Sequence, residues 1–222
     1  MTWSLGVDPG ASGAAVLLGP SGRGVVGWAW VARTRSGRRA YEVAVCQWGR
    51  DPRVELVASI HDVGELIARG ARAVAGPEAR ILLGCEDQHV ARSARSAIIL
   101  ARSAGEVVGP LRRISDPEVA FIAPSEWRET FSVSGGKDVK ERAIAQVGAW
   151  IPEAEGLRAR AARSLGVALG AVEGVVEAFA IATRRRTWRK QPTRKRSNRS
   201  SRRGASGKRT RTSVRSRKGA GT

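Results

Sequence analysis

Two runs of the sequence decide the predicted fold: Leu5-Gly6-Val7-Asp8 and Leu83-Gly84-Cys85-Glu86. Each run reads leucine, glycine, an apolar residue and a carboxylate, and each lies in a segment with the pattern of a β-strand. If the two strands are parallel neighbours, Asp8 and Glu86 stand side by side at their carboxyl ends, where open α/β sheets place ligand sites. The glycine two residues before each acid removes side-chain bulk from the same face.

Outward from these runs, apolar periodicity predicts further strands and helices. The first part of the chain reads as an antiparallel meander, followed by alternating helix and strand. We expect strands at 3–8, 14–18, 25–31, 41–48, 81–86 and 119–123, a basic loop at 34–39, and helices at 63–74, 91–108, 138–150 and 165–183. Gly109-Pro110 should end the second helix, and Asp138 with Glu141 should open the third as a capping box. The predicted fold class is therefore α/β, a mixed sheet flanked by helices.

The last predicted helix carries small residues at every fourth position. They are Gly166, Gly170, Gly174, Ala178 and Ala182. Such a ridge permits close packing on the glycine-thinned sheet face, although glycine inside a helix costs about 1 kcal/mol relative to alanine. Glu173 and Glu177 are four residues apart and share a neighbouring face. We expect this helix to bring one or both glutamates to Asp8 and Glu86.

Three or four carboxylates in one place repel each other, and a divalent cation removes the conflict. Oxygen ligands suit Mg²⁺ or Mn²⁺, and a pair of such ions can activate a water and stabilise a leaving oxygen in phosphodiester hydrolysis. Simpler interpretations stay open. Asp8 precedes Pro9-Gly10 and could be only a turn residue, and Glu173 with Glu177 could be a solvated helix face.

Charge divides the 222-residue chain into two parts. The chain has 39 Lys and Arg against 20 Asp and Glu, a net charge of +19. Seventeen of the basic residues lie at 184–222, where there is no acid, so residues 1–183 are nearly neutral. The tail contains too little apolar surface to offset the entropy of ordering, so we predict a folded domain at 1–183 and a disordered tail at 184–222.

A flexible basic tail favours nucleic acid as a partner, because its charges bind phosphates without reading sequence. Arg184, Arg185 and Arg186 are the first such residues. A solubility or localisation tail is the alternative. No signal peptide and no apolar segment long enough to span a bilayer are visible, and Cys46 and Cys85 form no disulfide framework. A cytoplasmic location without membrane attachment is therefore expected.

Three motifs resemble those of RuvC-type Holliday junction resolvases. The run from Leu5 through Asp8-Pro9-Gly10 to Gly13 resembles their first motif, and Gly84-Cys85-Glu86-Asp87-Gln88 resembles their second. Glu177-Ala178-Phe179-Ala180-Ile181-Ala182 resembles part of their last helix. The run Ala123-Pro124-Ser125-Glu126-Trp127-Arg128, with Lys137 and Lys140, looks like the versions in phage-borne members. The likeness covers about residues 3–183 in the order of the family.

The resemblance implies an RNase H-like fold, a homodimer, two Mg²⁺ or Mn²⁺ ions and structure-selective cutting of four-way DNA junctions. Asp8, Glu86 and Glu177 take the positions of catalytic metal ligands. A further acid is usual three residues before the last, which here is Gly174, and the nearest carboxylate is Glu173. Either Glu173 reaches in from another angle, or three carboxylates suffice, or activity is weakened.

Basic and aromatic residues add candidate DNA contacts. Lys137 and Lys140 stand at a predicted helix start after Gly135-Gly136, where anions are favoured, and the resemblance makes Lys140 the better candidate for the scissile phosphate. The alternative is a solvated helix start. By resemblance, His89 can stack in the junction core, or it is an ordinary surface histidine. Trp127 and Phe131 are predicted to be core residues.

The leading hypothesis is a metal-dependent DNA endonuclease that resolves four-way junctions in recombination and repair, from a phage or other mobile element. Asp8, Glu86, Glu177 and Glu173 would hold the metals, and Lys140 or Lys137 would neutralise charge on the phosphate. One rival is another RNase H-like nuclease that acts on flaps, hybrids or duplex. The other is a non-catalytic nucleic-acid-binding protein on a decayed nuclease fold, bound chiefly through its tail.

Overall fold

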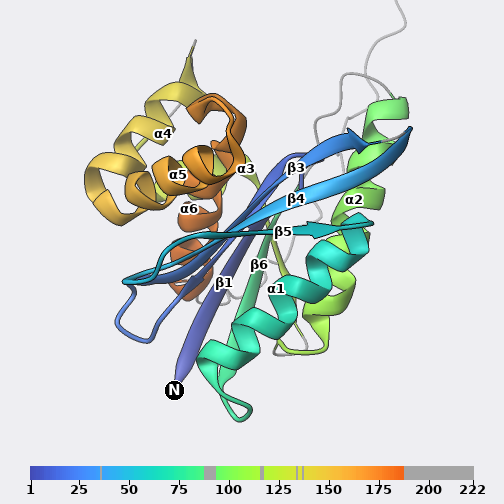
Figure 1. Ribbon diagram of the computed structural model, residues 1–222. Coiled ribbons are helices and arrows are strands. Elements are labelled where there is room, and N and C mark those ends of the chain that lie inside the picture. The colour runs from blue at the N-terminus through green and yellow to red at the C-terminus, as the bar shows by residue number, and fades with distance from the viewer. Residues whose placement is uncertain (36, 88–93, 116–117, 134, 137, 188–222) are drawn as a thin grey trace, which may run out of the picture. The chain divides into compact units, whose positions relative to one another are not determined.

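A seven-stranded mixed sheet runs through the computed structural model (Figure 1), which describes residues 1–35, 37–87, 94–115, 118–133, 135–136 and 138–187. The strands are β1 (Thr2–Asp8), β2 (Gly13–Leu18), β3 (Gly24–Arg35), β4 (Arg38–Gln47), β5 (Arg53–Val57), β6 (Arg80–Glu86) and β7 (Ala120–Ile122). The helices are α1 (Ile60–Ala75), α2 (Ala94–Arg112), α3 (Pro124–Thr130), α4 (Val139–Trp150), α5 (Pro152–Leu165), the 3-10 turn η1 (Leu169–Val172) and α6 (Gly174–Thr187).

The strand order is β5-β4-β3-β2-β1-β6-β7. Strands β1 to β5 form an antiparallel meander, while β6 is parallel to β1 and β7 is parallel to β6. Gly6 pairs with Gly84 in the register of β1 and β6. The parallel pairing predicted from the duplicated run is therefore confirmed, and it brings the ends of the two strands to one edge of the sheet.

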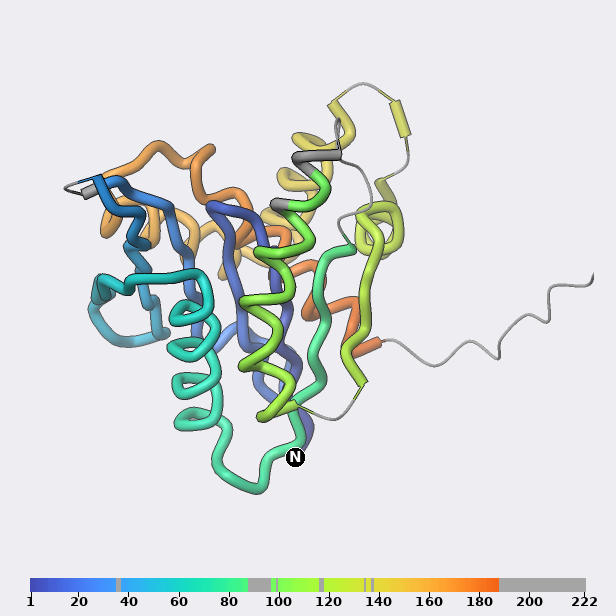
Figure 2. The backbone as a smooth tube through the Cα atoms, turned by 90° about the vertical axis from the view of Figure 1, so that its right-hand side faces the viewer, coloured from blue at the N-terminus to red at the C-terminus, as the bar shows by residue number. Residues whose placement is uncertain are grey.

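Helices cover both faces of the sheet. Helices α1 and α2 lie side by side over one face, as Figure 2 shows, and the helices that follow β7 lie behind the other. Each face has its own apolar core: Leu5, Val7 and Trp28 belong to the α1–α2 side, and Ala14, Trp127 and Phe179 to the α6 side. The predicted α/β class, a mixed sheet flanked by helices, is confirmed.

Several predicted boundaries are wrong. The basic loop expected at 34–39 is mostly strand: Arg35 of β3 pairs with Arg38 of β4, and Gly37 supplies the left-handed backbone that a tight hairpin needs, at φ +75°. Helix α2 continues through Gly109-Pro110 to Arg112. The sequence also failed to predict β5, α3 and α5. Strand β5 is only five residues long and mostly exposed, and the apolar residues of α5 are mainly small alanines, so both give a weak apolar signal.

Neither the capping box nor the long last helix expected from the sequence is present. Asp138 adopts a left-handed backbone conformation (φ 55°) and its side chain makes no capping hydrogen bond. The segment predicted as one helix from 165 to 183 is divided, because Gly166 ends α5 in a left-handed conformation and α6 begins only at Gly174. Of the predicted ridge, Gly174, Ala178 and Ala182 share α6.

Helix α6 also continues past the expected domain end to Thr187, so the first residues of the predicted tail are helical. The remainder of the tail, 188–222, lies outside the described residues, and the division of the chain at residue 183 stays a prediction. Within the described part of the chain, no single helix has the length and apolar character to cross a membrane. Two helical segments, 152–165 and 169–187, are joined by a sharp bend. They pass the length and composition criteria only when they are counted together.

Candidate metal centre

Three carboxylates from distant parts of the chain meet at the carboxyl edge of the sheet. Asp8 ends β1, Glu86 ends β6, and Glu177 lies in the first turn of α6. Each offers an oxygen, and these oxygens lie within 4.8 Å of one another. Asp8 and Glu177 are only 7% and 5% exposed, and Glu86 is half-buried. The cluster therefore has two buried acids, Asp8 and Glu177, and one acid, Glu86, that is more accessible to solvent.

Close contact between α6 and β1 brings Glu177 to the strand ends. A Cβ atom on Gly6 would overlap the carbonyl oxygen of Ala178 and would come within 2.5 Å of the amide nitrogen of Ala182. The Ser4 hydroxyl donates a hydrogen bond of 2.7 Å to the Ala182 carbonyl. Only glycine allows the helix backbone to approach this closely, so the predicted packing of small residues on the glycine-thinned face holds for the part of the ridge in α6.

The fourth expected acid does not join the cluster. Glu173 pairs with Lys140, at 3.4 Å from Nζ, and is not among the three clustered carboxylates. Gly174 faces the cluster itself, because a Cβ atom there would overlap Oδ2 of Asp8. The Asp8 carboxylate thus lies against the bare backbone at position 174, so in this arrangement the position has no room for a side chain.

Burial and the neighbouring carboxylates make Asp8 and Glu86 hard to ionise. Burial raises the pKa of Asp8 well above its usual range, and the carboxylates of Glu177 and Glu86 raise it further. Burial, followed by Glu177, raises the pKa of Glu86 to about 7, against the opposing effect of the Trp127 hydrogen bond and of Lys140. These carboxyls therefore carry an unfavourable free energy that a bound cation would remove.

Lys140 is the basic residue that the structure brings to the acids. Its Nζ, in the first turn of α4, lies 3.2 Å from Oε1 of Glu177 as well as near Glu173. Burial lowers its pKa, but Glu177, Glu173 and Asp8 together outweigh that effect and raise the pKa overall. Lys140 is charged at neutral pH and still 45% exposed, so its ammonium can face both the cluster and a ligand outside it.

Trp127 contributes a contact that the sequence analysis missed. Its ring is fully buried, as predicted for a core residue, and Phe131 is buried as well. The indole Nε1 also donates a hydrogen bond of 3.1 Å to Oε1 of Glu86. Arg128 lies over the same indole ring, 5.1 Å from its centroid. The contact could have been predicted from the sequence, because the indole N–H of a buried tryptophan usually donates to a hydrogen-bond acceptor.

The other predicted DNA contacts have different positions. His89 and Lys137 lie outside the described residues. Arg185 is buried, and its guanidinium donates to the carbonyl oxygens of Leu83 and Glu118 at 3.2 and 3.1 Å. The side chain fastens α6 to the sheet, and its role as a phosphate contact stays a prediction.

The neighbouring arginines of α6 are also part of the folded domain. Arg186 donates to the carbonyl oxygens of Gly19, at 2.8 Å, and of Pro20. Arg184 is half-buried. The end of α6 is therefore joined to the sheet and to the β2–β3 turn.

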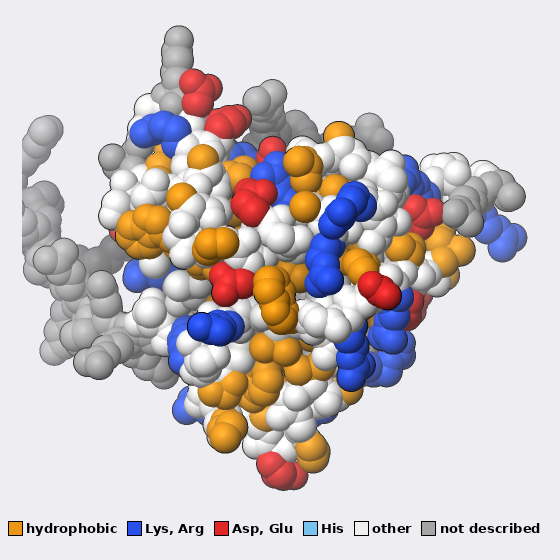
Figure 3. All heavy atoms as spheres, turned by 60° about the vertical axis from the view of Figure 1, so that its left-hand side comes forward, with side chains coloured by type: hydrophobic (Ala, Val, Ile, Leu, Met, Phe, Trp, Pro, Cys, Tyr) orange, Lys and Arg blue, Asp and Glu red, His pale blue; other side chains and the backbone are white. Residues whose placement is uncertain are grey.

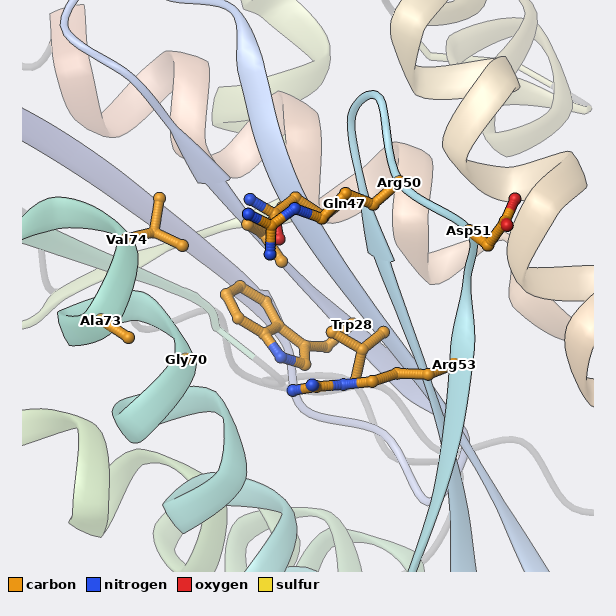
Figure 4. A pocket seen from close by; sticks show the side chains of 10 residues that line it. Trp28, Gln47, Arg50, Asp51, Arg53, Gly70, Ala73 and Val74 are labelled. Atoms are coloured by element: carbon orange, nitrogen blue, oxygen red, sulfur yellow. The ribbon is translucent and has the colours of Figure 1, made fainter.

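A well-formed cavity lies elsewhere. It has a volume of about 440 Å³ and is lined by α1 together with strands β3 and β4 and the loop into β5. Figure 4 shows Trp28 between Gln47 and Arg50 on one side and Arg53 on the other, with Asp51 pointing away. It contains none of the clustered acids, so we assign the chemistry to the carboxylates and not to this cavity.

The residues present fit a hard divalent cation. The donors are all carboxylate oxygens and come from three rigid elements, and burial together with the neighbouring carboxylates raises the pKa of Asp8 and of Glu86. Asp8, Glu86 and Glu177 can therefore hold Mg²⁺ or Mn²⁺. Glu173 lies outside this set because it pairs with Lys140, and the binding of two ions stays a prediction.

The antiparallel meander, the parallel β6 and β7 and the helix carrying Glu177 across β1 form the mixed sheet flanked by helices that the sequence predicted. No family model matches the chain, and no curated protein matches it. Among solved structures, Thermus thermophilus RuvC in complex with a Holliday junction substrate is similar at a TM-score of 0.41 and 14% identity, covering 82% of this chain and 91% of that chain. The structure of Thermus thermophilus RuvC alone is similar at a TM-score of 0.38 and 13% identity, covering 82% of this chain and 92% of that chain.

Proposed function

We propose that the protein is a metal-dependent DNA endonuclease with an RNase H-like fold and a preference for four-way junctions. The observation that carries the proposal is the convergence of Asp8, Glu86 and Glu177, whose ligand oxygens lie within 4.8 Å of one another. A purely structural role would not favour these acids together, because burial and the neighbouring carboxylates raise the pKa of Asp8 and of Glu86.

Each residue has a distinct task in this proposal. Asp8, Glu86 and Glu177 hold the metal, and a bound divalent cation supplies activation of water and stabilisation of the leaving oxygen in phosphodiester hydrolysis. The Trp127 indole orients Glu86 through its hydrogen bond. Lys140 balances the acids in the free protein, and in this proposal it also binds a non-bridging phosphate oxygen of the substrate.

Junction preference is the finer part of the proposal. It is supported by the order of the sequence motifs, which resembles RuvC-type resolvases, and by the basic character of the chain after residue 183. The homodimer, the phage origin and the cytoplasmic location belong to the same proposal. Flap, hybrid and duplex cutting are the alternative substrates that the experiment compares.

The test is cleavage of labelled synthetic DNA by the full chain with Mg²⁺ or Mn²⁺. We expect cutting of a four-way junction that survives excess linear duplex, and a loss of at least about 100-fold in Asp8→Asn and Glu177→Gln. Asp51→Asn is the matched control, because Asp51 is an exposed acid in the β4–β5 loop. Undiminished cutting in Asp8→Asn would refute the metal site, and equal cutting of junction and duplex would refute the junction preference.

A decayed, non-catalytic fold is the second candidate, and it rests on Gly174 in place of the acid usual in the family. It predicts junction binding with no metal-dependent cutting by any variant. Removal of the tail separates the two, provided that it begins after Trp188 and not at residue 184, because Arg185 and Arg186 hold α6 in place. A nuclease keeps metal-dependent cutting after this deletion, whereas a binder that relies on its tail loses nearly all affinity.

A further inference from the structure

The hairpin of β3 and β4 extends beyond the rest of the sheet. Trp30 is the last residue of β3 that pairs with β2, and Tyr41 is the first residue of β4 that pairs with β5. Beyond them, Val31 and Ala32 pair with Glu42 and Tyr41, and residues 33–35 and 38–40 pair only with each other. We call these two segments the hairpin arm. At about 3.3 Å per residue, five residues of β3 reach about 17 Å past Trp30.

The hairpin arm leaves the sheet at the edge that carries the acids. Strands β1 and β3 both run antiparallel to β2, so they point the same way, and Asp8 and Trp30 end their pairing with β2 at neighbouring positions, Ala14 and Gly13. The Trp30 indole donates a hydrogen bond of 3.1 Å to the Gly10 carbonyl, in the loop that follows Asp8. Two strand spacings, about 10 Å, separate the base of the arm from β1.

The sequence of the hairpin is strongly basic. Positions 32–41 contain four arginines and no acid. Arg33 at the base is engaged, because it pairs with Glu42 at 3.0 Å and donates to the Leu165 carbonyl of α5 at 2.9 Å. Arg38 and Arg39 are exposed, and neither has an ion pair within the part of the chain that the structure describes. The arm is therefore fixed at its base and carries free charge further out.

The two exposed arginines lie on opposite faces. Residues paired across neighbouring strands share a face, and Arg38 is on the face of Ala44, which belongs to the α6 side. Asp8 also faces α6. Arg39 lies on the other face, 5.4 Å from the centroid of the Tyr41 ring. Figure 3, turned toward the α4–α6 side, shows basic side chains toward the right-hand border of the molecule.

We propose that the hairpin arm binds the phosphate backbone of duplex DNA beside the cutting site, with Arg38 as the contact on the face of the acids. The position beside the cut rests on the proposed function, whereas the binding of DNA by the arm does not. Combining about 17 Å along the arm with about 10 Å across the sheet puts its far end about 20 Å from Asp8. At 3.4 Å per base pair, this corresponds to about six base pairs of duplex.

The first test compares DNA affinity in Arg38→Ala and in the full wild-type chain, in EDTA so that no cutting occurs. A phosphate contact predicts about three- to tenfold weaker binding of a four-way junction near 100 mM salt. It also predicts that the slope of log affinity against log salt falls by about 0.9. The control is Arg69→Ala, which removes the same charge from an exposed position on α1. If both variants lose affinity and slope equally, the proposal is wrong.

The second test locates the arm on DNA, so that binding by the tail cannot mask it. Cys46 and Cys85 are both buried, so Arg38→Cys provides one exposed thiol for a maleimide-benzophenone crosslinker. We expect crosslinks about six base pairs from the cutting site, and few from Arg69→Cys. Crosslinks from Arg38→Cys that match those from Arg69→Cys would overturn the proposal. If the arm passes both tests but no variant cuts DNA, the proposed nuclease fails and the DNA-binding arm remains.

Discussion

Glu86→Gln should make the metal-free protein more stable at pH 8. Glu86 is packed among acids at the end of β6, and its ionised form is disfavoured by burial and by Glu177. Glutamine has almost the same shape, and its Oε1 can still accept the hydrogen bond that Trp127 donates. The substitution therefore removes the charge while it keeps the packing and the indole contact.

The magnitude follows from the pKa of Glu86, which is about 7 in the folded protein against a usual 4.5. A carboxyl with a raised pKa in the fold contributes its stability below pH 4.5 and loses it as the pH rises through 7. At pH 8 the ionised Glu86 therefore costs about 3 kcal/mol. For a domain of this size, removing that cost corresponds to a rise in Tm of about 5–10 °C.

Thermal unfolding followed by circular dichroism, in EDTA, measures this effect. The variant should melt above the wild type at pH 8 and level with it at pH 4, where both carry a neutral side chain. The control Glu129→Gln changes an exposed glutamate of α3 and should leave Tm within about 1 °C. Mg²⁺ at 100 times its Kd should raise the stability of the wild type by about 2.7 kcal/mol and that of the variant by less. A variant that is less stable than the wild type at pH 8 would refute the reasoning.

Three further predictions concern the neighbours of the acids. Gly174→Ala should destabilise the protein by about 1–3 kcal/mol in thermal melts, because the new methyl group overlaps Asp8. The control Gly170→Ala should not destabilise it, because the new Cβ comes no closer than 3.8 Å to Glu173. Trp127→Phe should weaken Mg²⁺ binding several-fold in calorimetry and cost about 1 kcal/mol of stability, because Glu86 loses its hydrogen bond; unchanged Mg²⁺ affinity would contradict an orienting role. Lys140→Ala should tighten Mg²⁺ binding several-fold, because it removes a competing cation from the acids. It should also reduce DNA cutting, because it removes the positive charge that faces the phosphate. An equal loss of Mg²⁺ affinity and of cutting would indicate a purely structural lysine.

The strands that carry the acids could be predicted because their signals are local. Leu5-Gly6-Val7-Asp8 and Leu83-Gly84-Cys85-Glu86 lie in apolar stretches bounded by turn residues, and their duplication suggested the parallel pairing that the register confirms. The apolar periodicity of α1 is equally local, and the structure adds a capping box between Ser59 and Asp62. Such features depend on side chains that are neighbours in sequence.

The last helix was harder to predict because its beginning depends on tertiary contacts. Small residues at every fourth position suggested one continuous helix, yet Gly166 adopts the left-handed conformation that ends α5. Position 174 then starts α6 at a point where only a glycine fits against Asp8. Helical spacing in sequence does not distinguish a glycine that lies inside a helix from one that ends it.

The sequence by itself determined which acids could meet: the two strand-end carboxylates, set by local periodicity, and one or both of Glu173 and Glu177. Only the tertiary structure decided that Glu173 pairs with Lys140, that Trp127 donates to Glu86, and that Arg185 holds α6 to the sheet. These contacts join residues from different elements, and their partners depend on how closely the helices approach the sheet. That approach is set by packing across the whole core, which no local pattern records.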